Sequence, residues 1–123
     1  MKIIVTGASG FIGRVLVEKL LNEGNIVFPI IRAKTNKNFI TPEITDYYED
    51  DGDDDKLLKF IKRSNCEGVI HLASYFMVTH KTGDITPLIN SNVHFPTRII
   101  DASCKANIEW FLNIGTFWEH MNH

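Results

Sequence analysis

The first residues of the chain constrain its fold more than any other segment. An apolar run at 2–5 leads directly into Thr-Gly-Ala-Ser-Gly-Phe-Ile-Gly at 6–13. The run predicts a buried strand, and the spacing of apolar residues over 11–23 predicts a helix that ends at Gly24. The segment therefore predicts a strand, a glycine loop and a helix in succession, which is the start of a βαβ unit.

The glycines of this loop lie three residues apart, at Gly7, Gly10 and Gly13. Gly7 suits a tight turn, Gly10 lets the backbone approach a bound group, and Gly13 allows close packing of the helix on the strand. Free backbone N–H groups and the positive end of the helix dipole then face one point, where they favour an anion. The loop therefore predicts a site for the pyrophosphate of a dinucleotide rather than a purely structural turn.

Short β-branched runs alternate with helical segments along the rest of the chain, as in a parallel sheet covered by helices. We predict an α/β fold, a Rossmann-type doubly wound parallel sheet of about five strands in the order 3-2-1-4-5. It forms one domain over 1–123, with no second domain. The further predicted strands are 25–31, 44–48, 68–72 and 108–114, and the further helices are 56–63 and 86–106.

Two prolines fall inside predicted elements. Pro29 lies in the second strand, where it removes a donor from the hydrogen-bond ladder. Pro96 lies in the long last helix and is expected to bend it. The start of that helix is predicted at Thr86-Pro87, with the threonine as N-cap and the proline as first helical residue.

The end of the second strand decides which dinucleotide is expected. An acidic side chain there would bind the ribose diol of NAD, and none occurs over 27–38. The sequence instead offers Arg32, with Lys34 and Lys37 beyond it. Because a guanidinium can bind a 2′-phosphate through two hydrogen bonds, the sequence favours NADP, with NAD as the alternative.

The composition argues against several other classes of protein. The formal net charge of −2 gives no general attraction to nucleic acid or to an anionic membrane. No stretch reaches the ~18 apolar residues of a membrane span, and the start of the chain does not resemble a signal peptide. Cys66 and Cys104 are isolated thiols without metal-like spacing, so we expect reduced cysteines, no metal site and a cytoplasmic protein.

Four segments resemble the extended short-chain dehydrogenases/reductases, the NAD-dependent epimerase/dehydratase family. TGASGFIG has the TGxxGxxG spacing of that family, and GVIHLAS resembles its fourth strand. INSNVHFPTRIIDAS resembles its asparagine-bearing helix, and EWFLNIGTFWEH resembles its fifth strand running into the catalytic Ser or Thr. The spelling GTFWEH is similar to the branch that contains CDP-abequose and CDP-paratose synthases, which reduce a 4-keto deoxysugar nucleotide with NADPH.

The resemblance implies a nucleotide-sugar substrate for the complete enzyme and a set of site residues. It assigns to Thr116 the catalytic hydroxyl that hydrogen-bonds the reacting sugar oxygen, and it places Asn92 near the cofactor. Arg32 would lie at the adenosine ribose and Asp51 near the adenine. The other cofactor-binding residues that it implies are Gly7, Ser9, Gly10, Phe11, Ile12, Gly13, Leu72, Ala73 and Ser74.

Several of these positions also have simpler interpretations. Ser74 and Asn92 can satisfy buried backbone groups. His71, at the end of an apolar strand, is more typical of a core histidine than of a metal ligand. The acidic run EDDGDDD at 49–55 is typical of helix caps and a solvated face.

The chemistry of the family also needs a Tyr-x-x-x-Lys pair, in which the lysine lowers the pKa of the tyrosine for proton transfer. No tyrosine of this chain has a lysine four residues later. We therefore expect a chain that binds cofactor without turnover, the first portion of a nucleotide-sugar epimerase, dehydratase or reductase. Two alternatives stay open: a stand-alone NADP(H)-binding or redox-sensing module, and a non-functional truncated product that aggregates or forms a homodimer through its exposed fifth strand.

Overall fold

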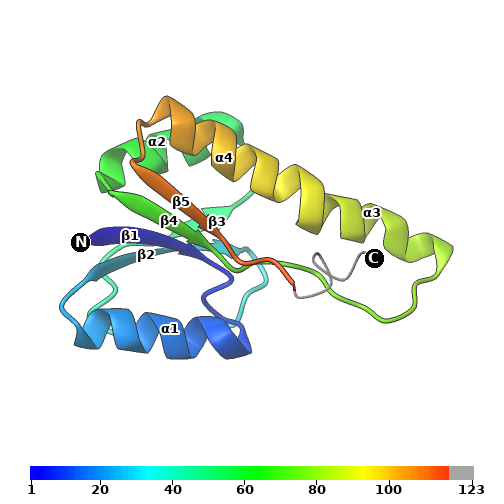
Figure 1. The fold of residues 1–123 in the computed structure, drawn as a ribbon, viewed down its shortest axis with the longest axis horizontal. Helices are drawn as coiled ribbons and strands as arrows, with labels where there is room; N and C mark the ends of the chain where they lie inside the picture. The colour runs from blue at the N-terminus through cyan, green and yellow to red at the C-terminus, as the bar shows by residue number, and fades with distance from the viewer. Residues whose placement is uncertain (117–123) are drawn as a thin grey trace, which may run out of the picture.

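The computed structural model describes residues 1–116 as a parallel sheet with helices on both faces (Figure 1). The strand order is β3-β2-β1-β4-β5, and each neighbouring pair is parallel. This order confirms the predicted Rossmann-type topology. The strands are β1 (Lys2–Thr6), β2 (Ile26–Arg32), β3 (Tyr48–Asp50), β4 (Gly68–His71) and β5 (Trp110–Asn113).

The helices form two layers around the sheet. Helix α1 lies below it in Figure 1, whereas α2 and α4 lie side by side above it. A helical stretch runs without a break from a 3-10 turn through α3 and a π-helical segment into α4. The bounds are α1 (Phe11–Asn22), α2 (Asp54–Ser64), the 3-10 turn Thr82–Asp84, α3 (Ile85–Ile89), the π-helical segment Asn90–His94 and α4 (Phe95–Lys105).

Alternate residues of the central strands build two separate cores. Ile4 and Val69 belong to the cluster that contains residues of α2 and α4. Ile3, Val5 and Val27 belong to the cluster that contains Val17 of α1. Strands covered on both faces bury every side chain, which explains why β1 and β4 read as continuous apolar runs.

The strand predicted at 44–48 is displaced in the structure, where β3 begins at Tyr48. Ile44 is buried, but it packs from the preceding loop against the core on the α1 side. An apolar residue that anchors a loop gives the same sequence signal as one in a short strand. The pairing with β3 begins at Ile30, so Pro29 of β2 precedes that ladder and does not interrupt it.

The helix predicted from Thr86-Pro87 begins earlier. The Asp84 carboxylate accepts a hydrogen bond from the Lys81 N–H at 2.8 Å, and the chain is already helical at Thr82. The π-helical segment ends at His94, two residues before Pro96. Proline cannot donate to the ladder of an α-helix, and a π-helical turn is a common way for a helix to absorb such a defect.

A close contact between β4 and β5 depends on a glycine. Gly68 lies opposite Trp110 in the register of the two strands. A Cβ atom at Gly68 would lie 1.9–2.2 Å from atoms of the Trp110 indole ring. The indole ring therefore occupies the space that a side chain at Gly68 would fill.

Candidate cofactor-binding site

A cavity of about 620 Å³ opens at the carboxyl ends of β1, β2, β3 and β4. In doubly wound sheets this edge, where the strand order reverses between β1 and β4, is where ligands bind. The loop after β1, the ends of β2 and β3, the segment after β4 and the α3–α4 stretch all contribute to it. The lining residues are Gly7, Ala8, Ser9, Gly10, Ile30, Ile31, Arg32, Thr35, Asp50, Gly52, Leu72, Ala73, Ser74, Asn90, Ser91, His94, Phe95 and Arg98.

The glycine loop has the geometry that its spacing predicts. Gly7 has a φ of +71°, and a Cβ atom there would lie 2.8 Å from the backbone nitrogen of Ala73. At Gly13, a Cβ atom would lie 2.1 Å from the carbonyl oxygen of Gly7, so α1 packs directly on the loop. The Gly10 N–H donates to the Gly7 carbonyl at 3.0 Å and closes the turn.

The start of α1 offers free donors beside the cavity. Gly10 is the N-cap residue, and no side chain caps this end of the helix. The N–H groups of Phe11, Ile12 and Gly13 have no partner within the helix ladder, as at any helix start. The side chains of Phe11 and Ile12 are 92% and 65% exposed and do not line the cavity, so only their backbone groups suit an anion there.

Buried polar contacts join the ends of β1 and β4. The Oγ1 atom of Thr6 lies 2.8 Å from Nδ1 of His71, and the Ala73 N–H donates to the same oxygen at 3.2 Å. The Leu72 N–H donates to the Thr6 carbonyl at 3.2 Å. These bonds position the segment 72–74 along the cavity. His71 is 3% exposed and lies against the rings of Phe95 and Phe111, which confirms the core histidine predicted from the sequence.

The burial of His71 predicts that the stability of the fold depends on pH. Burial lowers the pKa of His71, and a backbone hydrogen bond with Ala73 opposes that effect. The unfolded chain takes up this proton near pH 6.5, whereas the folded chain takes it up only at lower pH. The unfolding free energy is therefore expected to fall below about pH 6.5, by at most about 1.4 kcal/mol per pH unit.

Urea unfolding of the chain between pH 5 and 8 measures this dependence. The His71→Asn variant keeps a polar atom near Thr6 but has no imidazole to protonate. We expect a shallower loss of stability for the variant than for the wild-type chain over the acidic half of the range. Parallel curves for the two proteins would show that His71 does not carry the dependence.

Arg32, the last residue of β2, lines the cavity and is exposed. Within residues 1–116, neither a hydrogen bond nor an ion pair involves its guanidinium group. Its backbone N–H donates to the Thr35 hydroxyl at 3.2 Å, which fixes the turn that follows β2. Lys37, in contrast, is ion-paired with Glu49 of β3. Of the three cations that the sequence offers here, Arg32 lines the cavity, whereas Lys34 and Lys37 do not.

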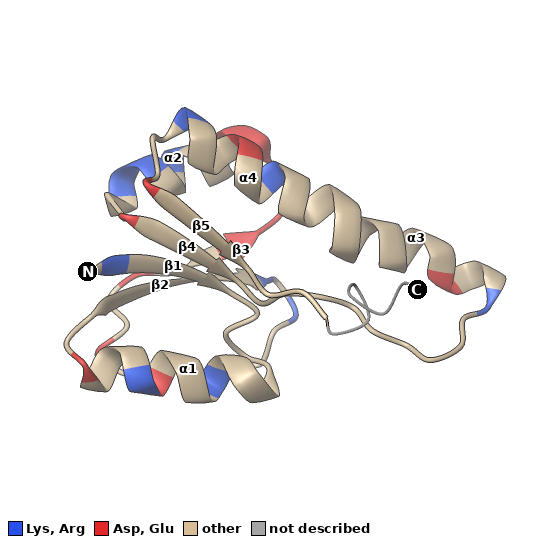
Figure 2. Ribbon diagram, viewed as in Figure 1, with Lys and Arg blue, Asp and Glu red and all other residues tan. Residues whose placement is uncertain are grey.

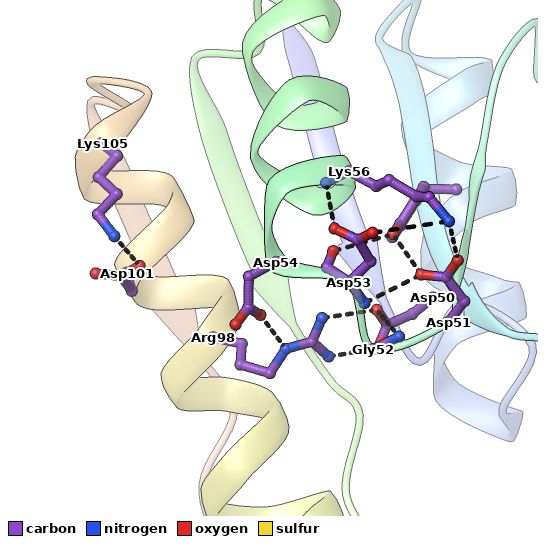
Figure 3. A network of polar contacts seen from close by, with 10 residues as sticks. Asp50, Asp51, Gly52, Asp53, Asp54, Lys56, Arg98, Asp101 and Lys105 are labelled. Carbon is purple, nitrogen blue, oxygen red and sulfur yellow. Dashed lines mark hydrogen bonds and ion pairs between the residues drawn. The ribbon is translucent and has the colours of Figure 1, made fainter.

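A partly buried ion-pair network that the sequence did not indicate joins β3, α2 and α4 (Figure 3). The Arg98 guanidinium donates to both carboxylate oxygens of Asp50, at 2.7 and 3.0 Å. Its Nε–H donates to Asp54 at 2.5 Å. The contact with Asp50, above all, raises the pKa of Arg98, and Arg98 lowers the pKa of Asp54. No helical or strand periodicity marks a pair 48 residues apart in the sequence, so only the fold reveals it.

Asp51 does not line the cavity, although its neighbours Asp50 and Gly52 do. Its carboxylate accepts a hydrogen bond from Lys56 at 2.6 Å, and this contact lowers the pKa of Asp51. Asp53 is the N-cap of α2 and accepts from the Lys56 N–H at 3.0 Å, as the sequence analysis of the acidic run predicts. The structure thus places Asp50, rather than Asp51, at the wall of the cavity.

Asn92 uses its side-chain amide to clamp the segment after β4. Its Oδ1 accepts from the Tyr75 N–H and its Nδ2 donates to the Tyr75 carbonyl, both at 2.8 Å. This is the backbone-satisfying role that the sequence analysis gave as the simpler interpretation.

Ser74 is exposed and lines the cavity. Thr116 is the last described residue, and it is exposed. The rest of the motif GTFWEH, residues 117–120, lies outside the described residues.

Two other kinds of feature are absent from residues 1–116. No group of three His, Cys, Asp or Glu side chains there is arranged to hold a metal ion. Nor does any helix among residues 1–116 have the length and apolar character needed to cross a membrane.

A doubly wound sheet with a glycine loop at the switch between β1 and β4 defines the class of Rossmann dinucleotide-binding folds. The family model of the NAD dependent epimerase/dehydratase family matches residues 3–120. The chain therefore belongs to this family, as its motifs predict.

Individual relatives agree with this membership. The chain is 32% identical over 125 residues to the CDP-abequose synthase of Salmonella typhimurium, covering 94% of this chain and 38% of that protein. It is 26% identical over 113 residues to a UDP-glucose 4-epimerase of Lactobacillus helveticus, covering 91% of this chain and 34% of that one.

Solved structures share the fold. A UDP-glucose 4-epimerase from Stenotrophomonas maltophila, solved with bound NAD and formylated UDP-arabinopyranose, has a TM-score of 0.84 at 18% identity. The match covers 100% of this chain and 39% of that one. The chain thus spans little more than a third of the length of the relatives it matches.

Proposed function

We propose that this chain is the cofactor-binding portion of an NADP(H)-dependent enzyme that modifies a nucleotide sugar. The observation that carries the proposal is the cavity at the carboxyl edge of the sheet, with the start of α1 on one side and Arg32 on another. Within residues 1–116, a Cβ atom at Gly10 would meet only the Gly7 carbonyl oxygen, at 3.2 Å, so this position is open. A pyrophosphate can therefore reach the free N–H groups of α1.

The lining residues divide the cavity by chemistry. The glycine loop would hold the pyrophosphate, and Arg32 would pair with the 2′-phosphate on the adenosine ribose. The segment 72–74 would lie along the nicotinamide side, held by Thr6 at Ala73 and followed by Tyr75, which Asn92 holds. Thr116 would present its hydroxyl to the sugar. A bound NADPH supplies the hydride for reduction, and these residues orient it and its substrate.

A nucleotide sugar is the substrate class that the relatives suggest. Their names include a CDP-abequose synthase and UDP-glucose 4-epimerases, and one structure holds a formylated UDP-arabinopyranose. The chain spans 38% of the first of these proteins, so the activity of the complete enzyme is part of the proposal. Reduction, epimerisation and dehydration of the sugar all fit a bound nicotinamide at this site.

We expect the 123-residue chain to bind cofactor without turnover. Proton transfer in this family needs a tyrosine whose pKa is lowered, and no tyrosine here has a lysine four residues later. At Tyr48 the pKa is instead raised to about 12, by burial above all and by the neighbouring Asp51. A phenol with so high a pKa is a poor proton-transfer group at neutral pH.

The Arg32→Asp variant tests the choice of cofactor. The aspartate would accept hydrogen bonds from the ribose diol of NAD and repel a 2′-phosphate. Loss of a charge-assisted pair costs about 1.5–3 kcal/mol, so NADPH affinity is expected to fall about 10- to 100-fold while NADH affinity rises. Calorimetric titration of both proteins with both cofactors measures the ratio.

Lys59→Asp provides a matched control for this test. It makes the same change of charge on the exposed face of α2, and Lys59 does not line the cavity. Its ratio of NADPH to NADH affinity should equal that of the wild-type chain. An unchanged ratio in Arg32→Asp would instead refute the role of Arg32.

A stand-alone NADP(H)-binding or redox-sensing module is a second candidate, favoured by the missing Tyr-x-x-x-Lys pair. The enzyme and the module both require cofactor binding. Only the enzyme also needs further sequence that contains the catalytic Tyr-x-x-x-Lys pair. Reading the gene downstream for a Tyr-x-x-x-Lys pair separates them. Its presence supports the enzyme, whereas a stop codon after residue 123 together with tight binding supports the module.

The third candidate is a truncated product, and it predicts a homodimer that forms through the free edge of β5. Within the described residues β5 pairs only with β4, and Leu112 and Ile114 are 49% and 46% exposed. The helical stretch 85–97 adds a second surface without charged residues (Figure 2). An apolar sheet edge favours association. Sedimentation of the chain as a stable monomer would count against this candidate.

We further propose one domain over 1–123 and a cytoplasmic location. Both cysteines are free thiols, with Cys66 buried and Cys104 exposed. An exposed free thiol suits a reducing compartment.

A further inference from the structure

The end of β2 and the end of β3 place an arginine beside an aspartate. Arg32 and Asp50 are direct partners in the register of the two parallel strands. Partners in neighbouring strands point their side chains to the same face and lie about 5 Å apart. Tyr48, two residues before Asp50, packs on the core beneath α2 and α4, so this face of the sheet is the one that α4 covers.

Asp50 nevertheless pairs with a different arginine. Arg98, from α4, donates two hydrogen bonds to its carboxylate, at 2.7 and 3.0 Å. The side chains of Arg98 and Asp50 are only 8% and 10% exposed, so water screens this pair little. Arg98 also reaches Asp54 at the start of α2, which ties three elements together beside the cavity. A bidentate pair of this kind is both strong and fixed in orientation.

The pairing determines the charge that the cavity wall presents. Arg98 cancels the charge of Asp50, and Arg32 keeps a guanidinium group without a carboxylate partner among residues 1–116. If Arg98 were absent, Asp50 would be a buried charge without compensation, with Arg32 as its neighbour on the adjacent strand. The aspartate would then compete with any phosphate for Arg32.

We propose that Arg98 determines cofactor specificity by holding Asp50, so that Arg32 is left to bind the 2′-phosphate of NADP(H). This inference rests on the proposed NADP(H)-binding function. It assigns a positioning role to a residue on α4 that acts on Arg32 through Asp50. In NAD-binding sites, an acidic residue at the end of the second strand binds the ribose diol. Asp50, at the end of β3, would not bind the ribose, because Arg98 holds its carboxylate.

Two small ligands isolate the adenosine end of the cavity. Adenosine 2′,5′-bisphosphate carries the 2′-phosphate, and adenosine 5′-monophosphate lacks it. Titration calorimetry of the 123-residue chain gives the ratio of their affinities without any catalytic assay. We expect the wild-type chain to prefer the bisphosphate and Arg98→Met to reduce that preference about tenfold. The double variant Arg98→Met/Asp50→Asn should restore it, since no competing carboxylate remains.

A single variant keeps the test decisive if Arg98→Met does not fold. Asp50→Asn removes the competitor directly and leaves Arg98 paired with Asp54. It should prefer the bisphosphate at least as strongly as the wild-type chain, and a reduced preference would overturn the inference. Arg63→Met is the control, because it breaks an exposed arginine–aspartate pair of 3.0 Å with Asp46, away from the cavity, and should not change the ratio.

The remaining outcomes separate the two proposals. A wild-type chain that binds neither ligand refutes the proposed function, and the inference falls with it. A wild-type chain that prefers the bisphosphate, with Arg98→Met keeping that preference, leaves the proposed function intact and overturns the inference alone. Equal weakening of both ligands in Arg98→Met, without recovery in the double variant, would show that Arg98 only supports the fold.

Discussion

The Gly7→Ala variant is expected to lose about 2–5 kcal/mol of unfolding free energy. The left-handed conformation of Gly7, with its φ of +71°, costs an alanine about 1–2 kcal/mol. The added methyl group would also lie 2.8–3.0 Å from backbone atoms of Leu72 and Ala73. Overpacking against groups that cannot move costs a further 1–3 kcal/mol or so. Urea unfolding at pH 7 measures the loss.

Gly24→Ala separates these two costs. Gly24 also has a positive φ, +81°, but a Cβ atom there would meet no atom of residues 1–116 within 4 Å. This variant should therefore lose only the conformational part, about 1–2 kcal/mol. Equal losses at Gly7 and Gly24 would mean that the loop after β1 does not pack against the segment after β4 as closely as the structure shows.

The Gly10→Val variant is expected to keep the fold and lose the cofactor. Gly10 has φ −72° and ψ 173°, a conformation open to any residue, and a Cβ atom there has a single close neighbour, 3.2 Å away. The side chain would instead occupy the approach to the free N–H groups of α1. Crowding of about 1–3 kcal/mol lowers NADPH affinity about 10- to 100-fold.

Unfolding and titration of the same Gly10→Val sample distinguish its two effects. We expect a change in unfolding free energy of about 1 kcal/mol or less, part of it from the weaker N-cap, beside the large loss of affinity. NADPH binding at the wild-type strength would place the pyrophosphate somewhere other than the glycine loop.

The sequence was sufficient to predict the sheet order and the glycine loop because both depend on local signals. Apolar runs and helical spacing define the elements, and parallel strands joined by helices have few allowed arrangements. Gly7 and Gly13 lie where their spacing predicts, with a positive φ at the first and close packing at the second. The position of Arg32 at the end of β2 was also predictable, because it follows the apolar run of that strand in the sequence.

Other features depend on contacts between segments far apart in the chain. Asp50, the last residue of β3, lines the cavity, whereas Asp51 follows the strand and its carboxylate pairs with Lys56. Nothing in the sequence near Asp50 indicates that Arg98 will reach it. The role of Gly68 likewise becomes visible only when β5 brings Trp110 across it.

The account as a whole depends on the cavity at the carboxyl edge of the sheet being a dinucleotide site with a preference for a 2′-phosphate. The most direct measurement is calorimetric titration of the 123-residue chain with NADPH and with NADH at one salt concentration. The account predicts one NADPH per chain, bound about tenfold or more tightly than NADH. Saturable binding of neither cofactor, or tighter binding of NADH, would contradict it.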